Sequence, residues 1–164
     1  NAIVEYERSL VTIDSPFDCY LKGDKNALNQ QQLAGLEMFQ DYGCVACHQG
    51  INVGGNMFQR FGVMGNYFSD RGKINPIDLG RYNLTKRERD RYVFKVPSLR
   101  NIFLSAPYFH DGSVARLGDA VKIMAKYQLG RELGEDEVAA LLAFLKSLTG
   151  LIPETDDTHA CKSS

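Results

Sequence analysis

The 164-residue sequence predicts an all-α domain in which a few helices are joined by long loops. Apolar residues recur at helical spacing in three stretches, around residues 33–43, 117–130 and 135–148. The stretch from 49 to 91 is instead rich in glycine and has no clear period. A loop region of this length is unusual in a compact domain, so we expect a non-protein group to provide part of the core.

The pentapeptide Cys44-Val45-Ala46-Cys47-His48 identifies that group, because it is the attachment pattern of a c-type haem. Its two thiols can add to the vinyl groups of the porphyrin, and the histidine that follows can reach the iron as proximal ligand. We therefore expect one covalent haem c in a cytochrome c-like helical domain. A zinc half-site and a redox dithiol are the alternatives. Zinc would need a second pair of ligands, but Cys19 and Cys161 stand alone and far apart in the sequence. A redox dithiol would be expected in a βαβ setting, and no such pattern is found.

Two helices are expected before the haem motif. The first covers residues 1–10, whose apolar stripe consists of Ile3, Val4, Tyr6 and Leu10. Ser15-Pro16 then marks a break, and residues 18–29 are polar with a turn at Gly23-Asp24. The second helix continues to Gly43, directly before the haem motif, where it would place both thiols on one side of the porphyrin.

Three further elements are expected after the motif. A short strand over residues 92–96 is ended by Pro97. A helix covers residues 117–130, and Gly130 lies just past its end. The last helix begins with the acidic residues 135–137, which suit the positive end of the helix dipole, and it ends at Gly150. We interpret the charge run at residues 86–91 as a solvated face.

The chain is expected to form one domain over residues 1–164, with an N-terminal helix and linker (1–30), a haem-binding core (31–150) and a polar tail (151–164). Its hydrophobic content of 44% and charged content of 24% are ordinary for globular proteins. The net charge of −1 gives no reason to expect a nucleic acid partner. No apolar run reaches the length of a membrane span. Because the chain begins without methionine, we expect a mature or excised product.

The chemistry of the four cysteines predicts a periplasmic location. Bacteria attach haem c outside the cytoplasm, and an oxidising compartment favours pairing of the two thiols that the haem does not use. Cys19 and Cys161 are therefore candidates for a disulfide, and the alternative is two unrelated free thiols. A disulfide would fix the polar tail to the N-terminal region and close a very long loop.

The function of such a haem depends on its second axial ligand. A methionine thioether raises the potential and gives an electron carrier, a second histidine lowers the potential, and an open position permits reaction with peroxide or a gas. The candidates are Met38, Met57, Met64, Met124, His110 and His159. Position in the sequence favours Met124, which lies on a helix remote from the motif, and leaves Met57 and Met64 as alternatives.

The other candidates have simpler interpretations. Met38 lies on the helix that leads into the motif and is expected in the core, while His159 is expected to be exposed in the polar tail. We expect His110 near the haem as a structural histidine that donates to a backbone carbonyl or a propionate. Arg100 is a further candidate for pairing with a propionate. An apolar shell around the haem is expected from Phe39, Phe61, Phe94, Phe109 and Leu145.

Four segments resemble the C-terminal domain of bacterial di-haem cytochrome c peroxidases. They are GCVACHQG at 43–50, FKVPSLRN at 94–101, SAPYFHDGS at 105–113 and AVKIMAKYQLG at 120–130. The similarity extends from the ERSL and LKGDKNAL stretches to AFLKSLTG, and so covers almost the whole chain. It implies a high-potential haem attached to Cys44 and Cys47, with His48 as the proximal and Met124 as the distal ligand.

The resemblance also implies partners and a second metal. Members of that family take electrons from a small soluble cytochrome or cupredoxin and reduce hydrogen peroxide at a second, peroxidatic haem in another domain. A calcium ion lies between the two domains, which implies backbone ligands at Ser105 and Pro107. A homodimer is a further expectation.

Two departures from that family bear on function. The chain has one CxxCH motif, so the peroxidatic haem is not part of it, and it has no tryptophan, although family members often carry one at the position of Ala115. We therefore expect an electron-transfer domain that accepts single electrons from a small periplasmic redox protein and passes them to a peroxidatic haem. The alternative is a stand-alone monohaem peroxidase that acts after loss of the Met124 ligand. Whether the chain by itself is an enzyme stays undecided.

Overall fold

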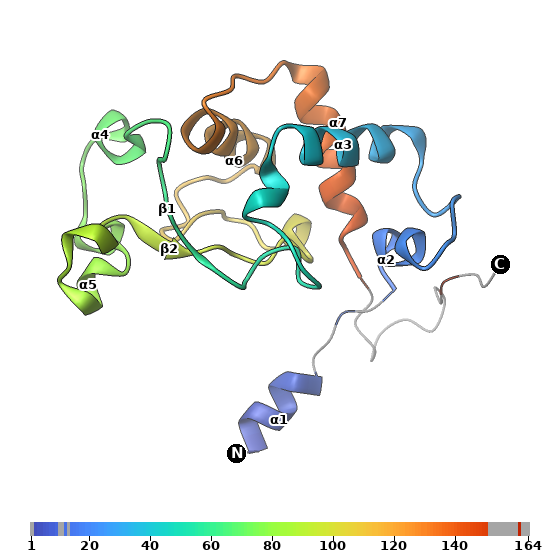
Figure 1. The fold of residues 1–164 in the computed structure, drawn as a ribbon, viewed down its shortest axis with the longest axis horizontal. Helices are drawn as coiled ribbons and strands as arrows, with labels where there is room; N and C mark the ends of the chain where they lie inside the picture. The colour runs from blue at the N-terminus through green and yellow to red at the C-terminus, as the bar shows by residue number, and fades with distance from the viewer. Residues whose placement is uncertain (1, 10–11, 13, 151–160, 162–164) are drawn as a thin grey trace.

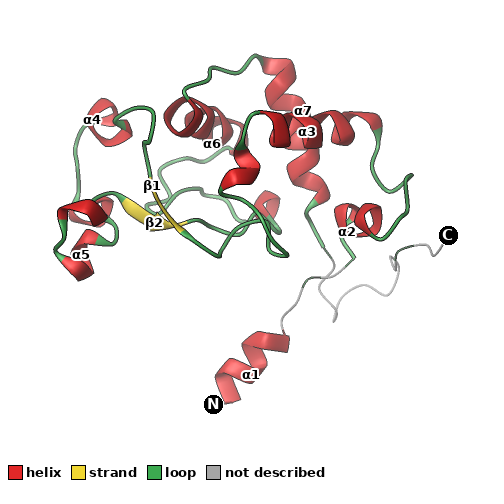
Figure 2. Cartoon of the chain, viewed as in Figure 1, coloured by secondary structure: helices red, strands yellow, loops and turns green. Residues whose placement is uncertain are grey.

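The computed structural model describes residues 2–9, 12, 14–150 and 161, and helices and loops dominate them (Figures 1 and 2). The α-helices are α1 (Ala2–Ser9), α2 (Pro16–Leu21), α3 (Gln30–Asp41), α4 (Tyr67–Arg71), α5 (Tyr82–Thr85), α6 (Leu117–Met124) and α7 (Glu135–Ser147). Shorter helical turns are η1 (Cys44–Ala46), η2 (Pro76–Leu79), η3 (Glu88–Asp90), η4 (Ile102–Leu104) and η5 (Ala125–Leu129). Strands β1 (Phe58–Arg60) and β2 (Val93–Lys95) form one small sheet. The predicted helical fold class is therefore confirmed.

Helix α2 is an element that the sequence analysis did not predict. The Ser15 hydroxyl accepts a hydrogen bond from the backbone N–H of Asp18 at 3.2 Å, and the Asp18 carboxylate accepts one from the N–H of Ser15 at 3.1 Å. Pro16 occupies the first helical position, where its missing N–H leaves no partner unsatisfied. The Ser15-Pro16 pair therefore begins a helix rather than a loop.

Helix α3 delivers the haem motif as predicted. Asn29 and Gln32 cap its start with reciprocal side-chain-to-backbone hydrogen bonds, each 2.9 Å long. The helix ends at Asp41, and Gly43 adopts a φ of +91° before Cys44 opens the turn η1. A residue with a Cβ would be strained at that φ, so glycine permits the sharp exit into the motif.

The first hydrophobic cluster lies where α3 crosses α7, the most extensive contact between elements of the described residues (Figure 1). Gly35 of α3 lies at the crossing, and a Cβ there would overlap the carbonyl oxygen of Ala140 on α7. This close approach buries Phe39, Val53, Leu141, Phe144, Leu145 and Leu148 together. The packing of α3 on α7 thus fixes the helix that leads into the haem motif.

The segment from 49 to 91 contains more secondary structure than its sequence predicts. It contains β1, α4, η2, α5 and η3, none longer than five residues and so too short to show a period. The strand predicted at 92–96 is found as β2, which pairs antiparallel with β1 so that Gln59 lies opposite Phe94. A second hydrophobic cluster forms here, with Phe61, Tyr67 and Phe68 buried at its centre.

The helix predicted over residues 117–130 is divided in two. Its first part is α6, which ends at Met124, and its second part is η5, a π-helical turn that ends at Leu129 and is followed by Gly130 with a φ of +66°. A π turn widens the helix by one residue, and such turns occur frequently at functional sites. The last helix, α7, begins with an acidic first turn as predicted.

Cys19 and Cys161 form a disulfide whose Cα atoms lie 5.1 Å apart, so the structure favours pairing over two free thiols. The bridge closes a loop with a sequence separation of 142. The rest of the predicted polar tail, residues 151–160 and 162–164, lies outside the described residues, as does His159. Among the residues that the structure describes, no helix is long and apolar enough to cross a membrane.

We predict that Gly35→Ala lowers the free energy of unfolding by about 3 kcal/mol, because the added methyl group pushes α3 away from α7. Gly118→Ala on α6 is the matched control, since a Cβ there would lie at ordinary contact distances of 3.5 and 3.6 Å from Val138 and Leu142. Its stability should be unchanged or slightly higher. Guanidinium unfolding of both variants checks this, and equal losses would contradict the close-approach account.

Candidate haem-binding site

The two thiols of the motif lie in and directly after the turn η1, half-buried and not bonded to each other. Cys44 packs against the first hydrophobic cluster. Burial raises the pKa of the Cys44 thiol, although its own backbone acts in the opposite direction. A zinc site needs thiolates, whereas a thioether to haem carries no charge and suits an apolar position. The environment of Cys44 therefore fits covalent haem better than zinc.

His48 points one ring nitrogen into the protein. Its Nδ1 is buried and makes no hydrogen bond of good geometry with a described residue. Burial lowers the pKa of His48, and the nearby backbone carbonyls of Pro97 and Val53 act against that shift. The imidazole is therefore held neutral, as a metal ligand must be, and Nε2 is the nitrogen available to an iron. A buried Nδ1 beside a backbone carbonyl is the arrangement that orients a ligating histidine.

The loop after the motif is held in place by the segment that follows β2. The N–H of Gly55 donates to the carbonyl of Val96 at 2.9 Å, and the N–H of Leu99 donates to the carbonyl of Val53 at 3.1 Å. Gly54 lies between these bonds with a φ of +125°, and a Cβ on it would overlap the carbonyl oxygen of Pro97. The same Cβ would lie 3.1 Å from Nδ1 of His48. Gly54 thus lets the Pro97 carbonyl approach the imidazole.

Met124 lies on the other hydrophobic cluster. It is half-buried at the end of α6 and packs against the buried rings of Phe61, Tyr67 and Phe68. Those rings contact one another closely, with Phe61 stacked on Tyr67 at a centroid distance of 4.5 Å. His48 instead lies beside the first cluster, where its ring is 6.4 Å from that of Phe39. The two candidate axial ligands therefore belong to different hydrophobic clusters.

The other methionines occupy different environments. Met38 is partly buried against the first cluster, the position expected for it. The carbonyl of Met57 accepts a hydrogen bond from Val96 beside the sheet. The side chain of Met64 is 63% exposed and lines an open hollow of about 580 Å³ formed by residues 59–66. Met124 therefore has the most enclosed aromatic setting among the three methionines considered as distal ligands.

The five residues expected to form an apolar shell separate into the two clusters. Phe39 and Leu145 are buried in the first, while Phe61, Phe94 and Phe109 belong to the second. The first of these clusters lies beside His48, and the second packs against Met124.

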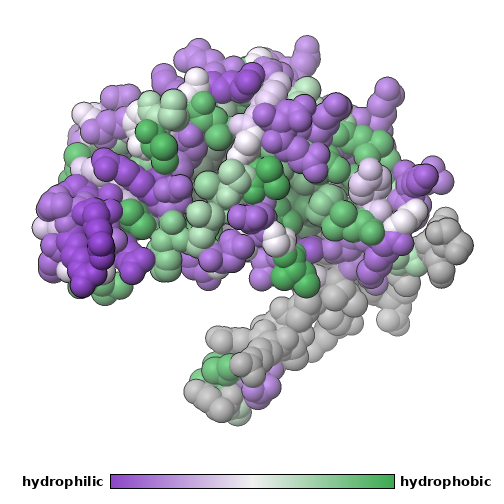
Figure 3. Space-filling view, viewed as in Figure 1, coloured by the Kyte–Doolittle hydropathy of each residue, from purple (hydrophilic) through white to green (hydrophobic). Residues whose placement is uncertain are grey.

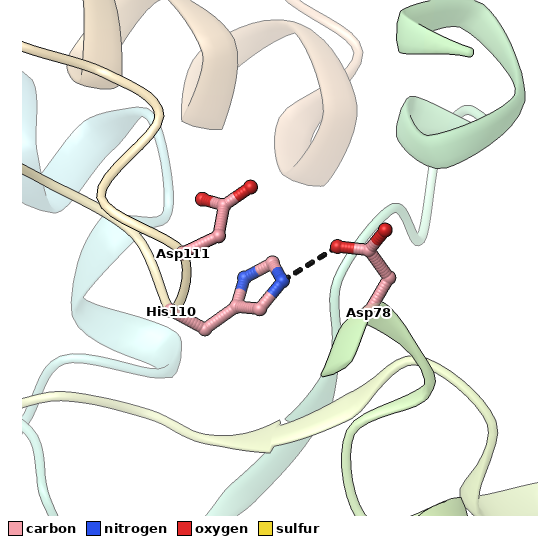
Figure 4. A group of neighbouring side chains, drawn as sticks. All are labelled: Asp78, His110 and Asp111. Carbon is pink, nitrogen blue, oxygen red and sulfur yellow. Dashed lines mark hydrogen bonds and ion pairs between the residues drawn. The ribbon is translucent and has the colours of Figure 1, made fainter. Parts of the chain in front are cut away.

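His110 lies in a polar network rather than against a carbonyl. Its Nε2 lies 2.7 Å from the carboxylate of Asp78, which is fully buried (Figure 4). Asp78 also accepts hydrogen bonds from the backbone N–H of Asn75 at 2.6 Å and from Arg71 at 2.5 Å. The expected partner of His110, a backbone carbonyl or a propionate, is thus replaced by a carboxylate. The imidazole lies 4.5 Å from the ring of Phe94, which connects the network to the second cluster.

Asp78, His110 and Asp111 lie close enough together to suggest a metal site, as Figure 4 shows. Arg71 excludes this interpretation, because its guanidinium bonds both Asp78 and Asp111, the latter at 2.8 Å. Burial alone would raise the pKa of Asp78, but the hydrogen bonds from Asn75, His110 and Arg71 lower it below its usual value. The group is therefore a hydrogen-bonded clamp that joins α4, η2 and the turn around His110.

Arg100 already has partners within the protein. Its guanidinium forms a bidentate pair with Asp18 at 2.7 and 2.9 Å, and its Nε donates to the carbonyl of Ile51 at 2.6 Å. Burial alone would raise the pKa of Asp18, but Arg100 and Ser15 lower it overall. A haem propionate is not required to balance Arg100, so its main role here is to tie α2 to the loop after the motif.

Ser105 and Pro107, the calcium candidates, lie on an exposed turn after η4. The Ser105 hydroxyl donates to the carbonyl of Ile102 at 3.0 Å. Neither backbone carbonyl of the pair accepts a hydrogen bond from a described residue. Both carbonyls are thus uncommitted within this part of the structure, and their calcium role stays a prediction.

Several residues of the site escaped the sequence analysis. The Gly54-Gly55 pair signals a close backbone approach, and it could have been used to find the contact with Pro97. Pro97 was interpreted only as the end of a strand. Asp78 and Arg71 have no comparable signal in the sequence. They are seven residues apart in an irregular segment, and no local pattern shows that two such residues form an ion pair.

The structure and the motif together define a cytochrome c. A family model described as cytochrome c matches residues 32–149, so the chain belongs to the cytochrome c family, in which the CxxCH motif holds covalent haem c. More particularly, the chain is 48% identical to the cytochrome c peroxidase Ccp of Escherichia coli over 92% of its length. It is 50% identical to the cytochrome c551 peroxidase of Pseudomonas aeruginosa and 51% identical to that of Nitrosomonas europaea, over 94% and 93% of its length. The resemblance to bacterial cytochrome c peroxidases is thereby confirmed.

These relatives are longer proteins. The chain covers 32% of the Escherichia coli protein and 44% of each of the other two. Among solved structures, a MauG-like protein associated with microbial copper homeostasis matches 84% of this chain and 52% of its own, with a TM-score of 0.70 and 29% identity. The chain therefore corresponds to less than half of the cytochrome c peroxidases it matches.

We predict that Gly54→Ala destabilises the haem-loaded protein by about 2 kcal/mol more than Gly55→Ala. Both glycines have positive φ values, +125° and +84°, so both substitutions strain the backbone. A Cβ at Gly55 has open space around it, whereas one at Gly54 meets Pro97 and His48. Guanidinium unfolding measures the difference, and indistinguishable midpoints would show that the Pro97 approach is unimportant.

We also predict that Asp78→Asn lowers the free energy of unfolding by about 3 kcal/mol at neutral pH, because it breaks a buried ionic network. The control is Asp119→Asn, whose pair with Arg116 is largely exposed, so its loss should leave the stability nearly unchanged. Since the pKa of folded Asp78 lies below the usual 3.8, its stabilisation is present above that pH and is lost as the pH falls further. The gap between wild type and Asp78→Asn should therefore narrow in acid. A gap independent of pH would contradict the ionic account.

Proposed function

We propose that this chain is the electron-transfer haem domain of a bacterial cytochrome c peroxidase system. In this proposal Cys44 and Cys47 bind one haem c covalently, His48 is the proximal ligand and Met124 is the distal ligand. The domain accepts single electrons from a small soluble redox protein, a cytochrome c or a cupredoxin. It passes them to a peroxidatic haem in a second domain, where hydrogen peroxide is reduced.

The observation that carries the proposal is the placement of His48 and Met124 on two different hydrophobic clusters. Haem c supplies a one-electron couple between ferric and ferrous iron. The neutral imidazole of His48 is oriented by the burial of Nδ1. The Met124 thioether would fill the remaining axial position, exclude peroxide and favour the reduced state. The apolar rings on both sides would disfavour the extra charge of ferric iron and so keep the potential high.

The similarity to longer peroxidases supports the remaining parts of the proposal. A periplasmic location suits a haem c protein with a disulfide between Cys19 and Cys161. The uncommitted carbonyls of Ser105 and Pro107 would be the contribution of this chain to a calcium site at a domain boundary. A homodimer is part of the same proposal.

A stand-alone peroxidase is the alternative function. This function would require Met124 to leave the iron. Met124 lies directly before a π-helical turn, and this position is the feature that favours such a movement. The isolated haem-loaded chain would then bind cyanide and turn over peroxide without activation.

We predict that Met124→Ala abolishes the sulfur-to-iron charge-transfer band of the ferric protein, lowers the reduction potential and admits cyanide. Met57→Ala and Met64→Ala are the matched controls and should keep the band and the potential. A near-infrared spectrum and a redox titration of the three variants decide the ligand. If Met64→Ala or Met57→Ala alone removes the band, Met124 is not the ligand; rapid cyanide binding by the wild type would instead favour the stand-alone peroxidase.

A further inference from the structure

The segment from 58 to 95 forms a strongly basic part of the molecule, here called the basic lobe. It carries nine lysine and arginine side chains and four acidic ones, a net charge of +5 in a chain whose total is −1. The sequence analysis interpreted part of it, residues 86–91, as an ordinary solvated face. Figure 3 shows a dense hydrophilic surface where Figure 1 places α5, at the end of the molecule remote from α2.

The acidic residues of the basic lobe are engaged by near neighbours. Asp78 is buried with Arg71 and His110, and Glu88 forms a bidentate bond with Arg91. Asp70 accepts a hydrogen bond from the Tyr127 hydroxyl, and the buried Asp90 lies 3.9 Å from Arg81. Six exposed basic side chains form no ion pair with a described residue, namely Arg60, Lys73, Lys86, Arg87, Arg89 and Lys95. The excess positive charge of the lobe therefore lies on exposed side chains.

Large apolar side chains lie exposed on the same lobe. Leu84 on α5 is 87% exposed, and Ile77 on η2 and Phe58 on β1 are 55% and 53% exposed. The guanidinium of Arg81 lies 4.8 Å from the centre of the Phe58 ring, so basic and apolar groups share one surface. A polyanion such as DNA would be attracted by the charges alone, whereas exposed leucine, isoleucine and phenylalanine beside arginine favour a protein partner.

The inner side of the basic lobe contacts the Met124 cluster. Tyr92, directly before β2, stacks on the fully buried Phe68 at a centroid distance of 4.6 Å. Phe68 in turn belongs to the cluster against which Met124 packs. The basic lobe and the proposed distal ligand therefore share one hydrophobic cluster.

We propose that the basic lobe docks the acidic face of a small soluble redox protein. This inference rests on the proposed electron-transfer function and adds the charge of the donor and the place where it binds. Complementary charge accelerates encounter and selects acidic donors over basic ones, and the exposed apolar side chains would be covered in the complex.

The test measures binding of two oxidised probes, an acidic plastocyanin and a basic mitochondrial cytochrome c, to the oxidised haem-loaded chain by calorimetry. The variant Arg87→Glu/Arg89→Glu should weaken plastocyanin binding about tenfold at low salt, while the control Lys25→Glu/Lys146→Glu, with the same charge change, should weaken it less than about threefold. The difference should shrink between about 10 and 150 mM salt, as the Debye length falls from about 30 to about 8 Å. The variant Arg87→Gln/Arg89→Gln removes the two charges without reversing them and should lose less affinity for plastocyanin. A graded loss over the two variants would show that charge, rather than misfolding, causes the effect.

Four binding results would overturn the inference. If the two charge-reversal variants weakened plastocyanin binding equally, the basic lobe would be excluded as the docking site. If the basic cytochrome bound more tightly than plastocyanin, the preferred donor would be basic rather than acidic. Lobe-dependent binding of heparin without binding of plastocyanin would assign the lobe to polyanions, and lobe-dependent self-association would assign it to a second copy of the chain. Electron transfer is measured separately, because two oxidised partners bind without exchanging an electron. If plastocyanin binds but its reduced form then fails to reduce the haem, the proposed function would be contradicted and the docking inference would stand.

Discussion

The hydrogen bonds between the loop at 51–55 and the segment at 96–100 fix the surroundings of His48, the histidine of the haem motif. They place the Pro97 carbonyl against Gly54 and His48, and one nitrogen of the imidazole is buried there. Arg100 extends the same constraint to α2 through Asp18, and the disulfide joins α2 to Cys161. A glycine-rich loop that would otherwise have no core is thus fixed by backbone pairing, by one buried ion pair and by the helix crossing at Gly35.

The second side of the molecule is built differently, from rings rather than long helices. Phe61, Tyr67 and Phe68 form a compact aromatic centre supported by a two-stranded sheet and several short helices. The clamp around Asp78 holds three of these pieces together through hydrogen bonds from Asn75, Arg71 and His110. Because these partners all belong to the chain, the clamp gives the loops around the aromatic cluster a fixed geometry.

In the proposed function these two sides have complementary roles. His48 beside the first cluster would supply a neutral imidazole, and Met124 on the second would supply a soft thioether in an apolar setting. The chain corresponds to less than half of the peroxidases that it resembles. The basic lobe extends the distal side outward, so that one segment provides both aromatic packing inside and a charged surface outside.

The sequence by itself determined the haem motif, the helix that leads into it, the helices at 117–130 and 135–148, and the resemblance to cytochrome c peroxidases. These features depend on local spacing, on capping residues or on short motifs. Helix α2, the clamp of Asp78 with Arg71 and His110, and the Pro97 approach to His48 depended on tertiary structure, because each joins residues whose partners no local pattern specifies. The partner of Arg100 is the clearest case: its charge was evident in the sequence, but only folding could decide that Asp18, 82 residues away, would balance it.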